Sequence, residues 1–98
     1  MLVRVVKLSF KPEDIETFLA NFETNKDKIR NFEGCEHLEL WQDEYKSNQF
    51  FTYSHWVSED ALNNYRQSEL FKNVWSKTKP LFNAKPEAWS VRQKAILD

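Results

Sequence analysis

The sequence predicts a single α+β domain with ferredoxin-like βαββαβ order and a four-stranded antiparallel sheet. The 98 residues leave room for one domain, and strand-like and helix-like segments follow one another in that order. A third observation is that the strands carry apolar side chains in both phases. We therefore expect both helical regions on one face of the sheet and a second copy of the chain on the other, giving a homodimer.

The first strand is expected over residues 2–10. Val3 and Val5 point to one face of this strand, and Val6 and Leu8 point to the other. A strand with apolar groups in both phases is typical of a sheet that is covered on both sides.

A long amphipathic helix is expected over residues 12–31. Pro12 suits the first turn of a helix, and apolar residues then recur at helical spacing as far as Phe32. Gly34 ends this segment, because glycine adopts the left-handed conformation that often follows a helix.

The next two strands are expected over residues 35–42 and 49–57, with a polar turn between them. If that turn centres near residue 46, His37 and His55 lie opposite each other across the hairpin.

The second helical region begins at Ser58, a good N-cap, and Ser68 can cap a further segment. Pro80 and the residues after it end the region. A last strand is expected over residues 88–96.

Composition excludes several classes of function. Fourteen Lys and Arg residues are mixed with 15 Asp and Glu residues, and the net charge of -1 argues against a nucleic-acid-binding protein. No apolar run approaches the ~20 residues of a membrane span. The only cysteine, Cys35, forms no internal disulfide, and with no secretory leader it indicates a cytoplasmic protein.

The chain resembles the antibiotic biosynthesis monooxygenase family over nearly its whole length. The resemblance is carried by FFTYSHW at 50–56, SEDAL at 58–62, VKLSFKPE at 6–13, Gly34-Cys35, Tyr65, Ser68 and Phe71. It implies a dimeric α+β barrel of two ferredoxin-like halves, with a pocket between the sheet and the helices of each subunit. It also implies oxygenation of quinols and related phenols without metal or flavin, the activity of the best-known members.

Such chemistry needs an apolar pocket, a base or hydrogen-bond donor near the substrate oxygen, and a group that stabilises an oxyanion. We predict His55 as the base and the Tyr65 hydroxyl as the group that holds a substrate oxygen. Arg92 or Arg66 would stabilise an anion. The predicted substrate-binding residues are Tyr53, Trp56, Phe71, Trp75 and Arg92.

Each candidate has a structural alternative. His55 can be a hydrogen-bonded histidine at the dimer interface, and Trp75 can be ordinary core. The two histidines have no obvious third partner for a metal, although Glu39 shares a face with His37, so no metal or cofactor is predicted.

The chain departs from the family at two places. Many members carry a histidine near the position of Tyr65 and a second where this chain reads Ser68-Glu69-Leu70. The haem-degrading branch uses a histidine later in that helix, where Val74 and Trp75 stand here, which argues against haem degradation.

The sequence thus predicts a cofactor-independent monooxygenase that acts on a small hydroxylated, quinol-like aromatic. The alternative is a non-catalytic dimeric module that binds an apolar ligand or serves in a stress response.

Overall fold

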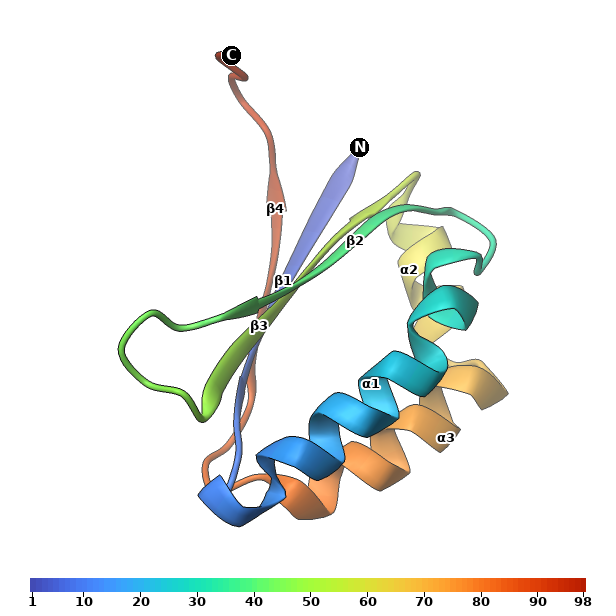
Figure 1. The fold of residues 1–98 in the computed structure, drawn as a ribbon. Coiled ribbons are helices and arrows are strands. Elements are labelled where there is room, and N and C mark those ends of the chain that lie inside the picture. Colours follow the sequence, from blue (N-terminus) through green and yellow to red (C-terminus); the bar gives the residue numbers. More distant parts are fainter.

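The computed structural model describes all 98 residues and confirms the predicted α+β fold. Its elements are β1 (Leu2–Ser9), a 3-10 turn (Pro12–Asp14), α1 (Ile15–Arg30), β2 (Cys35–Gln42), β3 (Gln49–Trp56), α2 (Glu59–Arg66), α3 (Glu69–Thr78), a second 3-10 turn (Lys79–Leu81) and β4 (Glu87–Arg92). The strands form one antiparallel sheet in the order β2-β3-β1-β4. All three α-helices lie on the same side of it, and no chain segment covers the other side (Figure 1).

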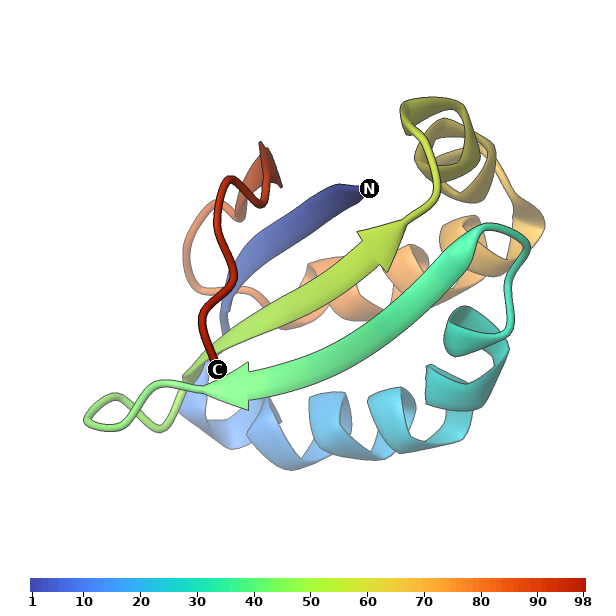
Figure 2. The ribbon, with the colours of Figure 1, turned by 90° about the horizontal axis from the view of Figure 1, so that it is seen from above.

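Strand pairing assigns every side chain of the sheet to one of two faces, because neighbouring residues on a strand point in opposite directions. Val5 on the central strand β1 lies opposite Tyr53 on β3 and Trp89 on β4, so these three share a face. This is the open face, which no helix covers. The helix-side face carries the alternate residues, such as Val6 of β1 and Thr52 of β3. Figure 2 shows the sheet from above, with the β2–β3 loop extending beyond it at the end away from α2.

The two helix starts of the second helical region are those that the sequence predicts, whereas the first helix begins at Ile15, after the 3-10 turn Pro12–Asp14. The Ser58 hydroxyl accepts a hydrogen bond from the Ala61 amide at 3.1 Å and caps α2. The Ser68 hydroxyl accepts one from the Phe71 amide at 3.1 Å and caps α3. These two caps split the second helical region into two short helices, and Pro80 ends it within the 3-10 turn.

Gly34 closes the connection between α1 and β2. Its φ of +90° lies in the left-handed region, and a Cβ at this position would lie 2.5 Å from the Cβ of Ala61. Both the backbone conformation and the close approach of α2 therefore require glycine here.

The two buried clusters of the core lie on the helix side of the sheet, and Val3 is the one buried hydrophobic residue on the open face. The first comprises Ile29, Cys35, Trp56, Leu62 and Tyr65. The second comprises Leu8, Phe10, Phe18 and Phe50. Residues of both clusters line the same cavity, so the core surrounds a hollow between the sheet and the helices.

The predicted last strand is wrong in extent. β4 ends at Arg92, and Ile96 and Leu97 are 70% and 95% exposed. Arg92 pairs with Leu2, the first residue of β1, so the chain beyond Arg92 has no neighbouring strand with which to form hydrogen bonds. No helix is long and apolar enough to span a bilayer.

Candidate functional site

A cavity of about 340 Å³ lies between the helix-side face of the sheet and the three helices. β1 contributes Arg4, Val6 and Leu8 to its wall because these residues share one strand phase. β3 contributes Thr52, Ser54 and Trp56 in the same way, and 13 of the 20 lining residues are hydrophobic. This volume lies within the usual range of small-molecule sites, roughly 300–1,000 Å³.

Aromatic rings from three elements form a continuous row along this cavity. Trp56 stacks on Tyr65 with ring centroids 5.0 Å apart, and Tyr65 meets the edge of Phe71 at 5.3 Å. Phe71 in turn stacks on Trp75 at 5.7 Å. Such a row presents flat apolar surfaces, which suit an aromatic ligand.

The Tyr65 hydroxyl is the buried phenol of the cavity. Burial, and to a smaller degree the nearby Cys35 thiol, raises the pKa of Tyr65 above its usual value. Tyr65 therefore keeps its proton at neutral pH, which excludes it as a general base. It can still donate a hydrogen bond to an oxygen of a bound molecule.

Two arginines add positive charge to the cavity wall. Arg4 comes from β1, and Arg66 comes from the last turn of α2. Burial, followed by the charge of Arg66, lowers the pKa of Arg4, which nevertheless stays a cation at neutral pH.

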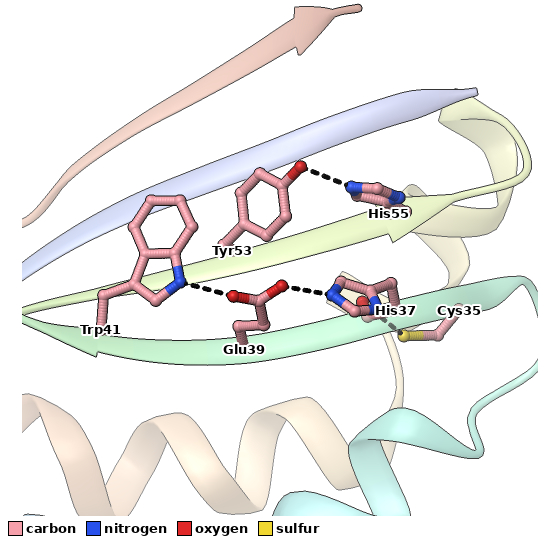
Figure 3. A network of polar contacts seen from close by, with 6 residues as sticks. All are labelled: Cys35, His37, Glu39, Trp41, Tyr53 and His55. Atoms are coloured by element: carbon pink, nitrogen blue, oxygen red, sulfur yellow. Dashed lines mark hydrogen bonds and ion pairs between the residues drawn. The ribbon is translucent and has the colours of Figure 1, made fainter. Parts of the chain in front are cut away.

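The open face carries a different set of groups, drawn in Figure 3. The Trp41 indole N–H donates to Glu39 Oε1 at 2.8 Å, and the other carboxylate oxygen of Glu39 contacts His37 Nε2. Tyr53 and His55 are joined through the phenol oxygen and Nε2 at 2.7 Å. The rings of His37 and His55 lie 5.1 Å apart, as the predicted hairpin register requires.

These contacts shift two pKa values on the open face. Hydrogen bonds from His37 and then Trp41 lower the pKa of the Glu39 carboxyl. Partial burial, and then the neighbouring His37, lowers the pKa of His55. No group of three or more His, Cys, Asp and Glu side chains is arranged to hold a metal ion.

The comparisons with known proteins agree with this geometry. The family model of antibiotic biosynthesis monooxygenases matches residues 1–75, which is most of the chain. The chain belongs to the antibiotic biosynthesis monooxygenase family. Among curated proteins, none matches the chain.

Solved structures match the fold of this family member closely at low sequence identity. An antibiotic biosynthesis monooxygenase superposes with a TM-score of 0.90 at 19% identity, covering 97% of this chain and 100% of that one. A conserved protein from Methanosarcina mazei Go1 gives 0.88 at 22%, covering 96% and 94%. Rv0793 from Mycobacterium tuberculosis gives 0.83 at 16%, covering 99% and 95%.

Four of the predicted substrate-site residues, Trp56, Tyr65, Phe71 and Trp75, line the cavity of this family member, and so does Arg66, one of the two arginines predicted to stabilise an anion. Trp56 is packed against Tyr65 and is 1% exposed, whereas Phe71 and Trp75 are only partly buried. The roles of these residues toward a substrate stay predictions.

The predicted placement of His55 and Tyr53 in that pocket is wrong. Both lie on the open face, because β3 alternates and Trp56 points to the helices. The sheet itself separates them from the cavity, so His55 is not positioned as a base for a molecule bound there.

Arg92 also lies outside the cavity. It shares the helix-side phase but stands at the end of β4, opposite Leu2. There it borders a separate small depression of about 170 Å³ beside Ser58 and Glu59.

The residue that the sequence analysis missed is Arg4. It shares a strand phase with Val6 and Leu8, so its position in the cavity follows from the alternation of β1. A charged residue in a phase that is otherwise apolar was the available signal.

Proposed function

We propose that this protein is a cofactor-independent monooxygenase that acts on a small hydroxylated aromatic, such as a quinol, in the helix-side cavity. The observation that carries the proposal is the row of aromatic rings along a cavity with a buried phenol donor, in a member of this family. Flat walls hold an aromatic ring in one orientation, and the Tyr65 hydroxyl donates to one of its oxygens.

The reaction needs no external reductant. A quinol reacts with dioxygen so that one oxygen atom enters a ring carbon and the other leaves as water. The quinol supplies the two electrons and two hydrogens that form the water, and a hydroxyquinone remains. The substrate reacts through its anion, which passes an electron to dioxygen, so groups that stabilise the anion accelerate the reaction.

Within this proposal each residue has a defined part. Phe71 and Trp75 hold the ring, Trp56 supports Tyr65 by stacking on it, and Tyr65 donates a hydrogen bond that strengthens as charge develops on the substrate oxygen. His55 has no place in the step, since it lies across the sheet. The substrate proton passes to solvent.

We further propose that the protein works as a homodimer joined through its open faces. Trp41, Trp89 and Val91 are 40%, 43% and 45% exposed on this face, and Tyr53 and Val5 lie half-buried between them. An apolar sheet face of this kind is rare on a monomer, and a second copy related by two-fold symmetry covers both faces at once. We also place the protein in the cytoplasm, because its only cysteine is a buried free thiol.

Oxygen uptake with a panel of quinols tests the activity. We expect consumption of dioxygen by the wild-type protein, with one dioxygen used for each quinol converted. Tyr65→Phe keeps the ring and removes only the hydroxyl, and it should lower the rate by about tenfold or more. Absence of turnover across the panel, with the protein folded, would contradict the proposal.

The second candidate is a non-catalytic module that binds a small aromatic molecule in the same cavity. It is favoured by one observation, that neither histidine lines the cavity. Calorimetry separates the two functions, since a binding module takes up the quinols with no consumption of dioxygen.

A further inference from the structure

Two guanidinium groups line the helix-side cavity without an acidic partner. We propose that Arg4 and Arg66 bind the negatively charged oxygen of an aromatic ligand, either a carboxylate or an ionised phenol. This inference rests on the proposed use of the cavity as the substrate site, and it adds the charge of the substrate.

The two arginines reach the same cavity from different elements. Arg4 projects from the central strand β1, and Arg66 from the C-terminal turn of α2. Arg4 Nη1 donates to Ser90 Oγ at 3.0 Å, which steadies the guanidinium and leaves its other N–H groups available.

No carboxylate neutralises either group. None of the ion pairs in the structure includes Arg4 or Arg66. The one acidic residue that lines the cavity, Glu87, already lies 3.5 Å from the Lys7 ammonium. Positive charge thus accumulates beside an apolar wall, and burial with the charge of Arg66 lowers the pKa of Arg4. A bound anion would relieve this repulsion.

The chemistry of guanidinium selects the ligand. Its planar fork of N–H donors matches the oxygens of a carboxylate, and it also binds a single oxyanion. The ring of the ligand then lies against Phe71 and Trp75, the stacked pair of cavity rings that is only partly buried. For the proposed oxygenation, this arrangement favours the ionised phenol, so the cavity needs no base of its own.

Calorimetric titration with three related probes tests the inference. Naphthoate carries a carboxylate, naphthol carries an ionisable hydroxyl, and naphthalenemethanol is a neutral molecule of similar shape. We expect naphthoate to bind wild-type protein on the order of tenfold more tightly than naphthalenemethanol. For naphthol, the absorbance of the ionised form should appear at lower pH when it is bound.

Variants assign the effect to the two arginines. Arg4→Gln and Arg66→Gln should each remove most of the advantage of the charged probe and leave naphthalenemethanol binding nearly unchanged. Lys77→Gln, which removes an exposed charge from α3 outside the cavity, is the matched control and should keep the full advantage. Arg66→Lys keeps the positive charge and should retain part of the affinity advantage of the charged probe. Circular dichroism checks that each variant is folded.

A charge-dependent gain for either naphthoate or naphthol that is lost in Arg66→Gln supports the proposal, and the probe that shows it identifies the kind of anion. The proposal is overturned if wild type shows no gain for either probe, or if both glutamine variants keep it. Oxygen uptake is recorded separately. Anion binding without turnover of any quinol would leave this inference standing and contradict the proposed activity.

Discussion

The two faces of the sheet differ although the same strands build both. The helix side holds the two buried core clusters and a largely apolar cavity, whose lining includes the Tyr65 phenol and two arginines. The open side holds both histidines, Glu39 and half-exposed aromatic rings, with no helix over them. His55 and Trp56 are neighbours on β3, yet Trp56 lines the cavity and His55 lies on the open face. Strand phase thus decides which side chains of the sheet can contact the same ligand.

The largest effect is expected on the helix side. Trp56 is 1% exposed, and Trp56→Ala should lower the free energy of unfolding by about 3–5 kcal/mol through lost burial and a new cavity. Tyr45→Ala is the control, since Tyr45 is 93% exposed in the hairpin loop and should change stability by less than about 0.5 kcal/mol. Urea denaturation measures both, and equal losses would contradict the assignment of the core to the helix side.

On the open side, a single charge should separate the proposed dimer. Val5→Glu would bury an unpaired carboxylate in the contact between two sheets, and we expect dimer formation to weaken by about 100-fold or more. Sedimentation should then report 11.8 kDa in place of twice that mass. Leu97→Glu is the control, because Leu97 is exposed outside the sheet. A wild-type protein that sediments as a stable monomer would rule out the dimer itself.

The Tyr65 hydroxyl should contribute to ligand affinity and not to the stability of the fold. Tyr65→Phe keeps the ring in its stack with Trp56, and it should leave the urea midpoint nearly unchanged. Affinity for a quinol should fall by about five- to tenfold, as expected for loss of one hydrogen bond. A large loss of stability with unchanged affinity would make Tyr65 a core residue only.

The smallest effect is a pH dependence of the open face. The folded-state pKa of His55 lies below its unfolded value, so its contribution to stability is full above about pH 6.5 and falls as pH drops below that value. The titratable groups near His55 are His37, Glu39 and the N-terminus of Met1, and Glu39 stays ionised in this window because its pKa is lowered.

We therefore expect the dimer to weaken several-fold between about pH 7.5 and about pH 5.5, because a protonated His55 would be buried between the sheets. Sedimentation at a series of pH values measures this change. His55→Asn should flatten the profile, and a profile that stays the same in this variant would assign the pH dependence to other groups.

Much of the fold followed from local patterns in the sequence. Ser58 and Ser68 cap helices, Gly34 makes the tight connection, and the polar turn sets the pairing of His37 with His55. These features depend on a few neighbouring residues, so one sequence is enough to find them. The predicted end of β4 was wrong because a strand needs a neighbouring strand for its hydrogen bonds. β1 begins at Leu2, so it provides no pairing residue beyond Arg92.

The site was harder to predict because it joins residues from four elements. Residue type favoured His55 and Tyr53, since histidine and tyrosine are common catalytic groups, yet Trp56 and Tyr53 cannot share a wall when they are three residues apart on one strand. The same rule would have selected Arg4. Arg66 of α2 and Arg4 of β1 line the same cavity. No local pattern predicts this, because it depends on how α2 packs on the sheet.

The four tryptophans allow one direct test of the division between the faces. Trp56 and Trp75 line the cavity, and Trp41 and Trp89 lie on the open face. In a nuclear magnetic resonance titration with naphthol, the indole N–H signals of Trp56 and Trp75 should move and the other two should stay nearly still. Dilution of the protein should move Trp41 and Trp89 instead. Ligand-induced shifts confined to Trp41 and Trp89 would contradict the account, because they would place the binding site on the open face.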